Sequence, residues 1–429
     1  MPSAPSSTSS AAGSPRAPID DPRNHVRTIG LLGAGALGLA WSLTTTAAYL
    51  PPLLDRFTSS TTLIALVLAA EGVFALTLPL VIGPWSDTFH TPLGRRRPFM
   101  LVAVGPLGFC LALMAFMPSF WTTALLVFAF FFAYYVYEPP YRGLYPDVLP
   151  GSVYGRAQGV QHVFRGVALG GALVGGGFLI DLWRPSPFVV AAFVVTVACL
   201  VPVVFVREDG GHGRVFEGVG VYLAHSWRVL RSNRDVAIFL GANAALEGTF
   251  AGARTFVVLY FTDGLGEPLK TSSFALGAVA VGYVVAALFA GQLGDRFGLA
   301  SVMVVGCCLY GAALVLAGAA QQWHQWYLGI VFVVAVAAGA VMTLAWGLLF
   351  KLMPPAERGA IAGLATTTKG VGLIIGPLLA GGVIDVFSDS LEATNGYQAL
   401  WPVLGVPILL SIPLMVKLVA AERRADARA

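Results

Sequence analysis

GRAQGVQHVFRGVALGGALVGGGFLID, residues 155–181, aligns without gaps on GAIAGLATTTKGVGLIIGPLLAGGVID, residues 359–385. Glycines recur at matching positions, and both segments end in Ile-Asp, at Asp181 and Asp385. The two segments start 204 positions apart, which is close to half of the 429-residue chain. The chain therefore contains an internal repeat, and we predict that its two halves share one fold and one orientation.

The composition excludes a soluble protein. Apolar residue types make up 57% of the chain and charged residues 11%, whereas about a quarter of the residues of a soluble domain are charged. A soluble enzyme, a nucleic-acid-binding protein and a disordered chain are excluded on this ground. A polytopic membrane protein fits, because each spanning helix requires about 20 mostly apolar residues.

Twelve apolar segments follow one another along the chain, and we predict that each forms a transmembrane helix. Their approximate ranges are 29–52, 61–83, 98–117, 120–145, 157–180, 187–206, 236–261, 273–293, 299–319, 325–350, 359–384 and 398–419. The predicted fold class is an all-α membrane protein with twelve transmembrane helices in two six-helix parallel repeats.

The basic residues of the connecting segments orient the chain. Nineteen Lys and Arg residues fall on the side of the N terminus, and only Arg56, Arg184 and Lys270 fall on the other. Because basic residues accumulate in cytoplasmic loops, both termini are predicted to be cytoplasmic. We expect a multi-pass protein of the plasma (inner) membrane.

The predicted organisation has five parts. They are a disordered cytoplasmic tail over 1–24, a six-helix bundle over 25–206, a cytoplasmic linker over 207–235, a second six-helix bundle over 236–420 and a tail over 421–429. In the linker, apolar residues from Phe216 to Leu230 recur at helical spacing beside Arg214 and Arg228. An amphipathic helix on the membrane surface is predicted there, with an ordinary solvated linker as the alternative.

The segment after the second apolar run reads GPWSDTFHTPLGRRRPFM, residues 83–100. This Gly-x-x-x-Asp followed by a basic cluster resembles the cytoplasmic signature of the major facilitator superfamily. The six residues between Asp87 and Gly94 and the ending Gly-Arg-Arg-Arg-Pro-Phe more narrowly resemble the sucrose-transporter-like sugar symporters, which are related to the glycoside–pentoside–hexuronide group. Pro140-x-Arg142, with Asp147 further on, resembles a second pattern of that group.

The resemblance implies a secondary transporter with one substrate site at the bilayer midplane, opened alternately to either side. It also implies a cytoplasmic gate. The residues assigned to this gate are Gly83, Asp87, Gly94, Arg95, Arg96, Arg97, Asp147 and, from the short form of the motif in the second half, Asp295. Simple anchoring of the chain by basic residues is the alternative for the three arginines.

Seven charged residues stand well inside the predicted spans, where a charge is costly and is therefore a functional hypothesis. They are Glu71, Glu138, Arg142, Arg165, Glu247, Arg254 and Lys369. Glu71 and Glu247 are the candidates for proton coupling, because burial can make a carboxylate protonatable near neutral pH. We hypothesise that Arg165 or Lys369 couples proton release to the substrate. A permanent ion pair, for instance Glu71 with Lys369, is the alternative.

In the architecture that the resemblance implies, the first, fourth, seventh and tenth helices line the central cavity, and the second, fifth, eighth and eleventh form the sides where the halves meet. Polar and aromatic residues on these helices are therefore expected to converge on one chamber, which would suit a sugar. The predicted substrate-binding residues are Trp41, Thr45, Tyr134, Arg142, Gln158, Gln161, Arg165, Asn243, Arg254, Trp346 and Lys369.

One motif suggests a cofactor. Gly33-Ala-Gly35-Ala-Leu-Gly38 matches the dinucleotide-binding fingerprint. It lies inside the apolar run from Ile29 to Leu54, without the strand and tight turn that the fingerprint requires. We interpret these glycines as small residues of the first transmembrane helix. We expect no cofactor, no metal site and no enzymatic activity.

The leading hypothesis is a secondary active transporter that works by alternating access as a proton-coupled symporter of a sugar or glycoside. A proton-coupled exporter of drugs or metabolites is the first alternative. An organic-anion carrier is the second, because Arg165, Arg254 and Lys369 outnumber the two midplane carboxylates. The expected partners are a small-molecule substrate, protons and the lipid bilayer, with no nucleic acid, and the protein is expected to function as a monomer.

Overall fold

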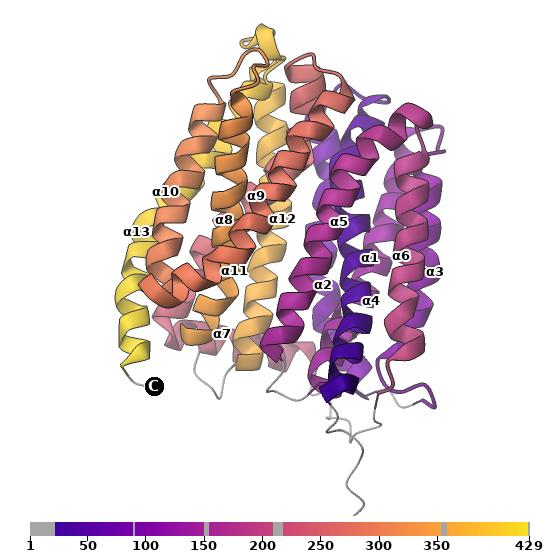
Figure 1. Ribbon diagram of the computed structural model, residues 1–429, viewed down its shortest axis with the longest axis vertical. Helices are drawn as coiled ribbons and strands as arrows, with labels where there is room; N and C mark the ends of the chain where they lie inside the picture. The colour runs from indigo at the N-terminus through magenta and orange to yellow at the C-terminus, as the bar shows by residue number, and fades with distance from the viewer. Residues whose placement is uncertain (1–21, 89–90, 150–153, 209–217, 353–357, 428–429) are drawn as a thin grey trace, which may run out of the picture.

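Twelve helices among the described residues are long and apolar enough to cross a membrane, which confirms the predicted spans. The structure, a computed structural model, describes residues 22–88, 91–149, 154–208, 218–352 and 358–427 (Figure 1). Helices dominate because a chain in lipid must satisfy its own backbone hydrogen bonds. Within the described residues the β-structure is limited to an isolated bridge between Thr91 and Gly94.

The first half of the chain forms six spanning helices. They are α1 (Pro22–Asp55), α2 (Thr61–Thr88), α3 (Arg97–Met114), α4 (Phe120–Val148), α5 (Tyr154–Leu182) and α6 (Ser186–Phe205). The shorter α7 (Val219–Ser232) follows. The second half begins with α8 (Arg234–Leu259), which continues into the π-helical turn η2 (Tyr260–Gly264). The other elements are α9 (Leu269–Phe297), α10 (Leu299–Ala317), α11 (Tyr327–Leu352), α12 (Arg358–Phe387), η4 (Glu392–Thr394), η5 (Tyr397–Ala399) and α13 (Leu400–Asp426).

The helices run side by side, with α1–α6 in one group and α8–α13 in the other (Figure 1). Helix α1 begins and α13 ends at the same end of the bundle, where α7 also lies. We call this end the terminal face and the opposite end the far face. The two groups meet where α2 packs against α12, α5 against α9 and α1 against α8. The sequence repeat thus places the fifth span, α5, and the eleventh, α12, at equivalent seams between the halves.

The glycines of the apparent dinucleotide fingerprint lie within the continuous helix α1. A Cβ atom on Gly35 would lie 2.6 Å from the Tyr141 ring, and one on Gly38 would lie 3.0 Å from the Cβ of Ala198. These glycines therefore bring α1 close to α4 and α6, as small residues do between transmembrane helices.

Glycines also bring α8 and α12 into backbone contact. A Cβ atom on Gly376 would lie 1.9 Å from the carbonyl oxygen of Gly248, and one on Gly252 would lie 2.8 Å from the carbonyl oxygen of Gly376. Other glycines of α12 face α2: a Cβ on Gly370 would meet the Gly72 carbonyl oxygen at 3.2 Å. Helix α12 is therefore wedged between α8 of its own half and α2 of the other.

Helix α7 occupies the predicted linker, and it packs against α12 and α8. Trp227 is exposed on it, and the Arg231 guanidinium lies 5.1 Å from the centre of the Trp227 ring. Arg214 and Phe216 lie outside the described residues, as does the predicted tail up to residue 21. The membrane-surface role of α7 and the domain boundaries remain predictions.

Replacing Gly376 by alanine is expected to destabilise the protein by about 1–3 kcal/mol, because the new methyl group collides with backbone that cannot rotate away. The measurement is the Tm of the purified protein in detergent. Gly382→Ala is the matched control, since Gly382 lies on the same helix with nothing within 4 Å of an added Cβ. Equal Tm values for the two variants would contradict the packing described for α12.

Candidate functional site

A cavity of about 190 Å³ lies between the two halves. Its lining comes from α1, α5, α8, η2, α9, α10, α11 and α13 and from the segments that follow η2 and α10. Most of the lining residues are Leu, Val, Ile and Ala. Eight are aromatic: Phe250, Tyr260, Phe261, Tyr283, Tyr310, Trp323, Tyr327 and Trp401. Arg254 is the charged residue among them.

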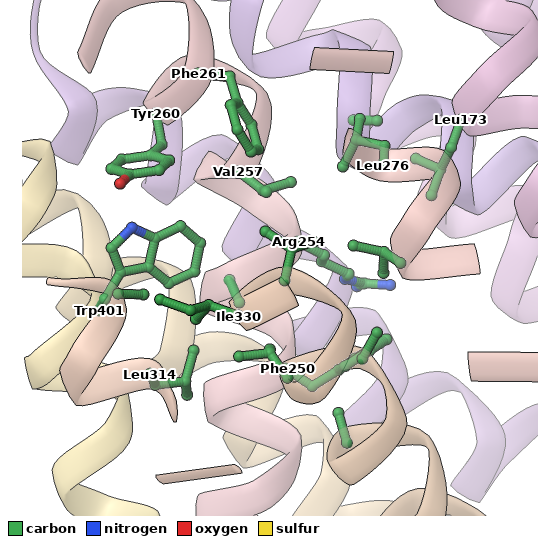
Figure 2. Close-up of a pocket in the computed structure, with 18 of the residues that line it drawn as sticks. Leu173, Phe250, Arg254, Val257, Tyr260, Phe261, Leu276, Leu314, Ile330 and Trp401 are labelled. Carbon is green, nitrogen blue, oxygen red and sulfur yellow. The ribbon is translucent and has the colours of Figure 1, made fainter. Parts of the chain in front are cut away.

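The aromatic rings form an edge-to-face cluster at the far end of the cavity. Tyr260 and Trp401 have ring centres 5.0 Å apart at 89° (Figure 2). The rings of Phe261 and Trp323 have centres 5.4 Å apart at 72°. Such pairs add to the free energy that burial alone supplies. The result is a rigid, apolar wall against which another flat ring could stack.

Arg254 projects from α8 into the cavity (Figure 2). Its Nη2 forms an ion pair with Glu71 Oε2 of α2, in the other half of the protein. The Glu71 side chain is only 6% exposed and the Arg254 side chain 21% exposed. Arg254 Nε is buried and meets no hydrogen-bond acceptor among the described residues. The site therefore holds a paired carboxylate, a cation and one unused donor.

The other intramembrane charges lie near this pair. Glu138 and Arg142 pair along one face of α4. Coulomb interactions link Lys369 to Glu247, Glu138, Arg142 and Arg165, and link Arg254 to Glu247. Arg165, Glu247 and Lys369 form no ion pair with any residue that the structure describes. The seven charges predicted from the sequence thus form one electrostatic network across the two halves.

The Glu71–Lys369 ion pair that the sequence offered as an example is not the pair found, because Glu71 binds Arg254 instead. Lys369 lies on α12 and Arg254 on α8, and both helices were predicted from the sequence. Which of them meets Glu71 depends on the rotation of each helix about its axis, and hydropathy does not determine that rotation.

Of the predicted substrate-binding residues, Arg254 lines the cavity. Trp41 packs over Gly171 of α5, where an added Cβ would lie 2.5 Å from its ring. Trp346 is 37% exposed and its ring lies beside that of Phe350. The others are buried or partly buried in the helices: Thr45, Tyr134, Gln161, Arg165, Asn243 and Lys369, with Arg142 more exposed. The side chain of Gln158 lies outside the described residues. Roles for these residues remain predictions.

Sequence reasoning missed most of the aromatic lining. Tyr260, Phe261, Trp323, Tyr327 and Trp401 stand at or just beyond the ends of predicted spans. Trp and Tyr at such positions are typical of anchors at the membrane–water interface. Only the packing of the span ends shows that they turn inward.

A cluster of charges at the terminal face joins three segments of the first half. Asp147 of α4 binds Arg95 Nη2 at 3.2 Å and Arg96 Nε at 2.6 Å. Glu208, just after α6, accepts hydrogen bonds from the backbone N–H groups of Arg95 and Arg96, each at 2.9 Å. Gly94 has φ of 103°, and a Cβ there would lie 2.6 Å from Glu208. Only glycine suits this position.

The second half repeats this arrangement. Glu422 of α13 accepts hydrogen bonds from the backbone N–H groups of Leu299 and Ala300, at 2.9 and 2.8 Å, and pairs with Lys351 Nζ at 3.0 Å. Glu208 and Glu422, at the ends of the sixth and twelfth spans, therefore both bind the start of the third span of their half. Neither glutamate belonged to the predicted gate. The residues that flank Glu208 differ from those that flank Glu422, so the sequence does not reveal that the two are equivalent.

Among the predicted gate residues, Arg95 and Arg96 pair with Asp147 of α4, and Arg97 Nε donates to the Val203 carbonyl oxygen of α6 at 2.6 Å. Asp295 is exposed, and a Cβ on Gly83 would only touch Pro139. The side chain of Asp87 lies outside the described residues. A gating role for these residues remains a prediction.

At the far face, Asp385 of α12 binds the start of α2 across the two halves. It accepts hydrogen bonds from the backbone N–H groups of Thr61 and Thr62, both at 2.9 Å, and from the hydroxyls of Ser60 and Thr61, at 3.0 and 2.7 Å. Its repeat equivalent, Asp181 of α5, is exposed and makes no hydrogen bond with any described residue. The α2–α12 seam is thus fastened at the far face.

Toward the terminal face the same seam opens. A second cavity of about 140 Å³ separates α2 from α12 there, and its lining residues are Ala75, Leu76, Pro79, Leu80, Pro84, Thr366 and Thr367. Close contacts between α2 and α12 occur on the side of this cavity that is nearer the far face, as between Gly72 and Gly370. Helices α2 and α12 therefore lie closer together toward the far face than beside this cavity.

The chain matches the sequence profile of the Major Facilitator Superfamily over residues 30–280 and again over residues 246–429. The multidrug resistance protein MdtG of Dickeya zeae is 25% identical to it over 412 residues, which cover 92% of this chain and 94% of MdtG.

Two solved structures have the same fold. The crystal structure of a mutant of the nucleoside transporter NupG superimposes with a TM-score of 0.76 at 13% identity, over 91% of this chain and 99% of NupG. A bacterial homologue of the human lysosomal transporter Spinster, in an inward-facing and occupied conformation, gives 0.70 at 14% identity, over 95% of this chain and 98% of the homologue. At these identities the likeness supports the fold alone.

Replacing Asp385 by asparagine is expected to loosen the far-face seam. Asparagine offers one neutral acceptor oxygen where the carboxylate offers two charged ones, and hydrogen bonds to a charged group are the stronger. Amide hydrogen exchange at Thr61 and Thr62 should rise by about tenfold. Asp181→Asn is the control, for which exchange at these residues should stay unchanged. The same exchange in both variants would show that Asp385 does not hold the seam.

Proposed function

Since the chain belongs to the Major Facilitator Superfamily of transporters, we propose that it moves lipophilic, aromatic small molecules across the membrane by alternating access and couples this movement to protons. The observation that carries this proposal is the cavity, with its aliphatic and aromatic lining and the single charged residue Arg254. Apolar walls with few polar groups suit a flat, lipophilic ligand.

The same lining argues against a sugar. A sugar presents many hydroxyl groups, and each that loses water without gaining a partner weakens binding. The cavity offers chiefly Arg254, Thr44 and tyrosine hydroxyls as polar groups. Sugar symport, which the subfamily resemblance implies, therefore stays a prediction. The relationship to a protein named for multidrug resistance supports the drug or metabolite class instead.

We propose that the terminal face is cytoplasmic, in accord with the distribution of basic residues. The contacts of Asp385 with α2 then lie on the external side, and the cavity between α2 and α12 lies on the internal side. This arrangement supports a conformation that is closed to the outside. Opening outward requires the Asp385 contacts to break.

For the proton, we propose Glu71. It is buried, and its only described partner is a cation from the other half. Protonation removes the charge that holds Arg254, so it weakens an interaction between the halves. Glu247 remains the second candidate, since it is partly buried and within the field of Lys369 and Arg254.

The charge of the substrate decides the direction of transport. A cation competes with the proton for Glu71, so that the two exchange, and an inward proton gradient then drives export. An anion competes with Glu71 for Arg254, so that anion and proton bind together and move in the same direction.

Replacing Glu71 by glutamine should abolish accumulation driven by a pH gradient, with a fall of about tenfold or more, because glutamine cannot bind and release the proton. Exchange of substrate for substrate, which moves no net proton, should persist. The measurement is uptake of labelled substrate into proteoliposomes with and without a pH gradient. Glu247→Gln is the matched variant and should retain gradient-driven accumulation. If Glu71→Gln accumulates substrate as well as the unaltered protein does, Glu71 is not the proton site.

The substrate class is tested with a panel of lipophilic dyes and disaccharides added to proteoliposomes that report internal pH. We expect proton movement on addition of aromatic compounds and none with disaccharides. Proton movement with a disaccharide alone would overturn the proposal in favour of sugar symport.

A further inference from the structure

The donors of Arg254 are only partly used. Its Nη2 is paired with Glu71, while Nε is buried and has no acceptor among the described residues. A guanidinium presents its N–H groups in a rigid fork that matches two oxygens of one acid group. An unused donor in an apolar site costs free energy until an acceptor reaches it. The cavity is therefore incomplete without an acceptor on the ligand.

The indole N–H of Trp401 is a second donor in the lining of the cavity, and it lies near the Tyr260 hydroxyl (Figure 2). Among the described residues, no Asp or Glu lines the cavity. A cationic ligand would find the Glu71 carboxylate already bound to Arg254. The lining thus offers donors and positive charge to a ligand.

This step rests on the proposed function. We propose that the substrate is an aromatic molecule with a single anionic acid group, such as a carboxylate or sulfonate. Two oxygens of that group bind Nε and an Nη of Arg254 and displace the Glu71 carboxylate. The aromatic body stacks in the chamber formed by Tyr260, Phe261, Trp323 and Trp401.

The displaced Glu71 then takes up a proton. Without Arg254 it is a buried carboxylate facing a second anion, and both burial and like charge favour its neutral form. Anion and proton therefore bind together and are carried together. The remaining charged and titratable groups around the pair come from five helices: Tyr134, Tyr135, Glu138 and Arg142 of α4, Arg165 of α5, Glu247 of α8, Tyr283 of α9 and Lys369 of α12. These groups include three further cations and two further carboxylates, so one bound anion does not leave the network with excess negative charge.

Naphthalene-2-sulfonate is the probe, because a sulfonate keeps its charge at every working pH. Binding of the radiolabelled compound to the purified full-length protein is measured by equilibrium methods, with naphthalene-2-sulfonamide and 2-naphthylmethylammonium as neutral and cationic competitors. We expect the sulfonate to bind at least about tenfold more tightly than either competitor. Its affinity should rise with falling pH, by up to about tenfold per pH unit, since one proton is bound with it.

Three variants separate the roles of the pair. Glu71→Gln removes the competing carboxylate and should bind the sulfonate about tenfold more tightly, with no pH dependence. Glu71→Gln combined with Arg254→Gln removes both charges of the pair, so that neither partner is left without the other. It should bind the sulfonate about a hundredfold more weakly. Its affinity for the neutral sulfonamide should stay within about threefold, which shows that the cavity is intact. Arg254→Lys keeps the positive charge but not the forked donors of the guanidinium. Its affinity for the sulfonate should lie between those of the unaltered protein and the double variant.

Transport gives an independent readout. Addition of the sulfonate outside proteoliposomes, with the membrane potential clamped near zero, should acidify the lumen as proton and anion enter together. Alkalinisation of the lumen would mean exchange and would overturn the inference.

Two other results would overturn it as well. The double variant could bind the sulfonate as tightly as the unaltered protein, or the cation or the neutral compound could bind best. In either case the proposed transport of lipophilic aromatics would still stand. If none of the three naphthalene compounds binds, the proposed function fails together with the inference.

Discussion

Glu71 and Arg254 face each other from opposite halves of the protein, and most of each side chain is shielded from solvent. Breaking such a pair leaves an uncompensated buried charge, at a cost of about 3–5 kcal/mol. Any rearrangement that parts α2 from α8 must therefore supply a replacement, either a proton for the carboxylate or an acid for the guanidinium. The cavity beside Arg254 can admit such an acid, and the charges around the pair influence whether Glu71 takes up the proton.

The fold followed from the sequence to a large extent because the bilayer leaves few alternatives. A run of apolar residues that must satisfy its own backbone becomes a helix, so the second span, predicted over 61–83, extends over Thr61–Ser86. The repeat between 155–181 and 359–385 predicted that α5 and α12 play equivalent parts, and both lie at seams between the halves. The scarcity of charge within the spans also singled out Glu71 and Arg254.

The pairing of those charges could not be predicted in the same way. Neighbouring residues of a helix point about 100° apart, so a small error in rotation exchanges Arg254 for Lys369 as the partner of Glu71. The aromatic wall was missed because Trp323 and Trp401 have the positions of interfacial anchors. Glu208 and Glu422 were missed for another reason: they are equivalent in space and in hydrogen bonding, although their surroundings share no letters. At these positions the two halves share the same hydrogen bonds, although their sequences differ.

The two seams at the far face are unequally fastened, although the repeat keeps an aspartate at both. Asp385 holds the start of α2 through four hydrogen bonds, whereas Asp181 is exposed. The α5–α9 seam relies on side-chain packing, as between the Phe178 and Phe274 rings. The halves need not part along both seams at once. The α5–α9 seam can therefore open while the four hydrogen bonds of Asp385 still join α12 to the start of α2.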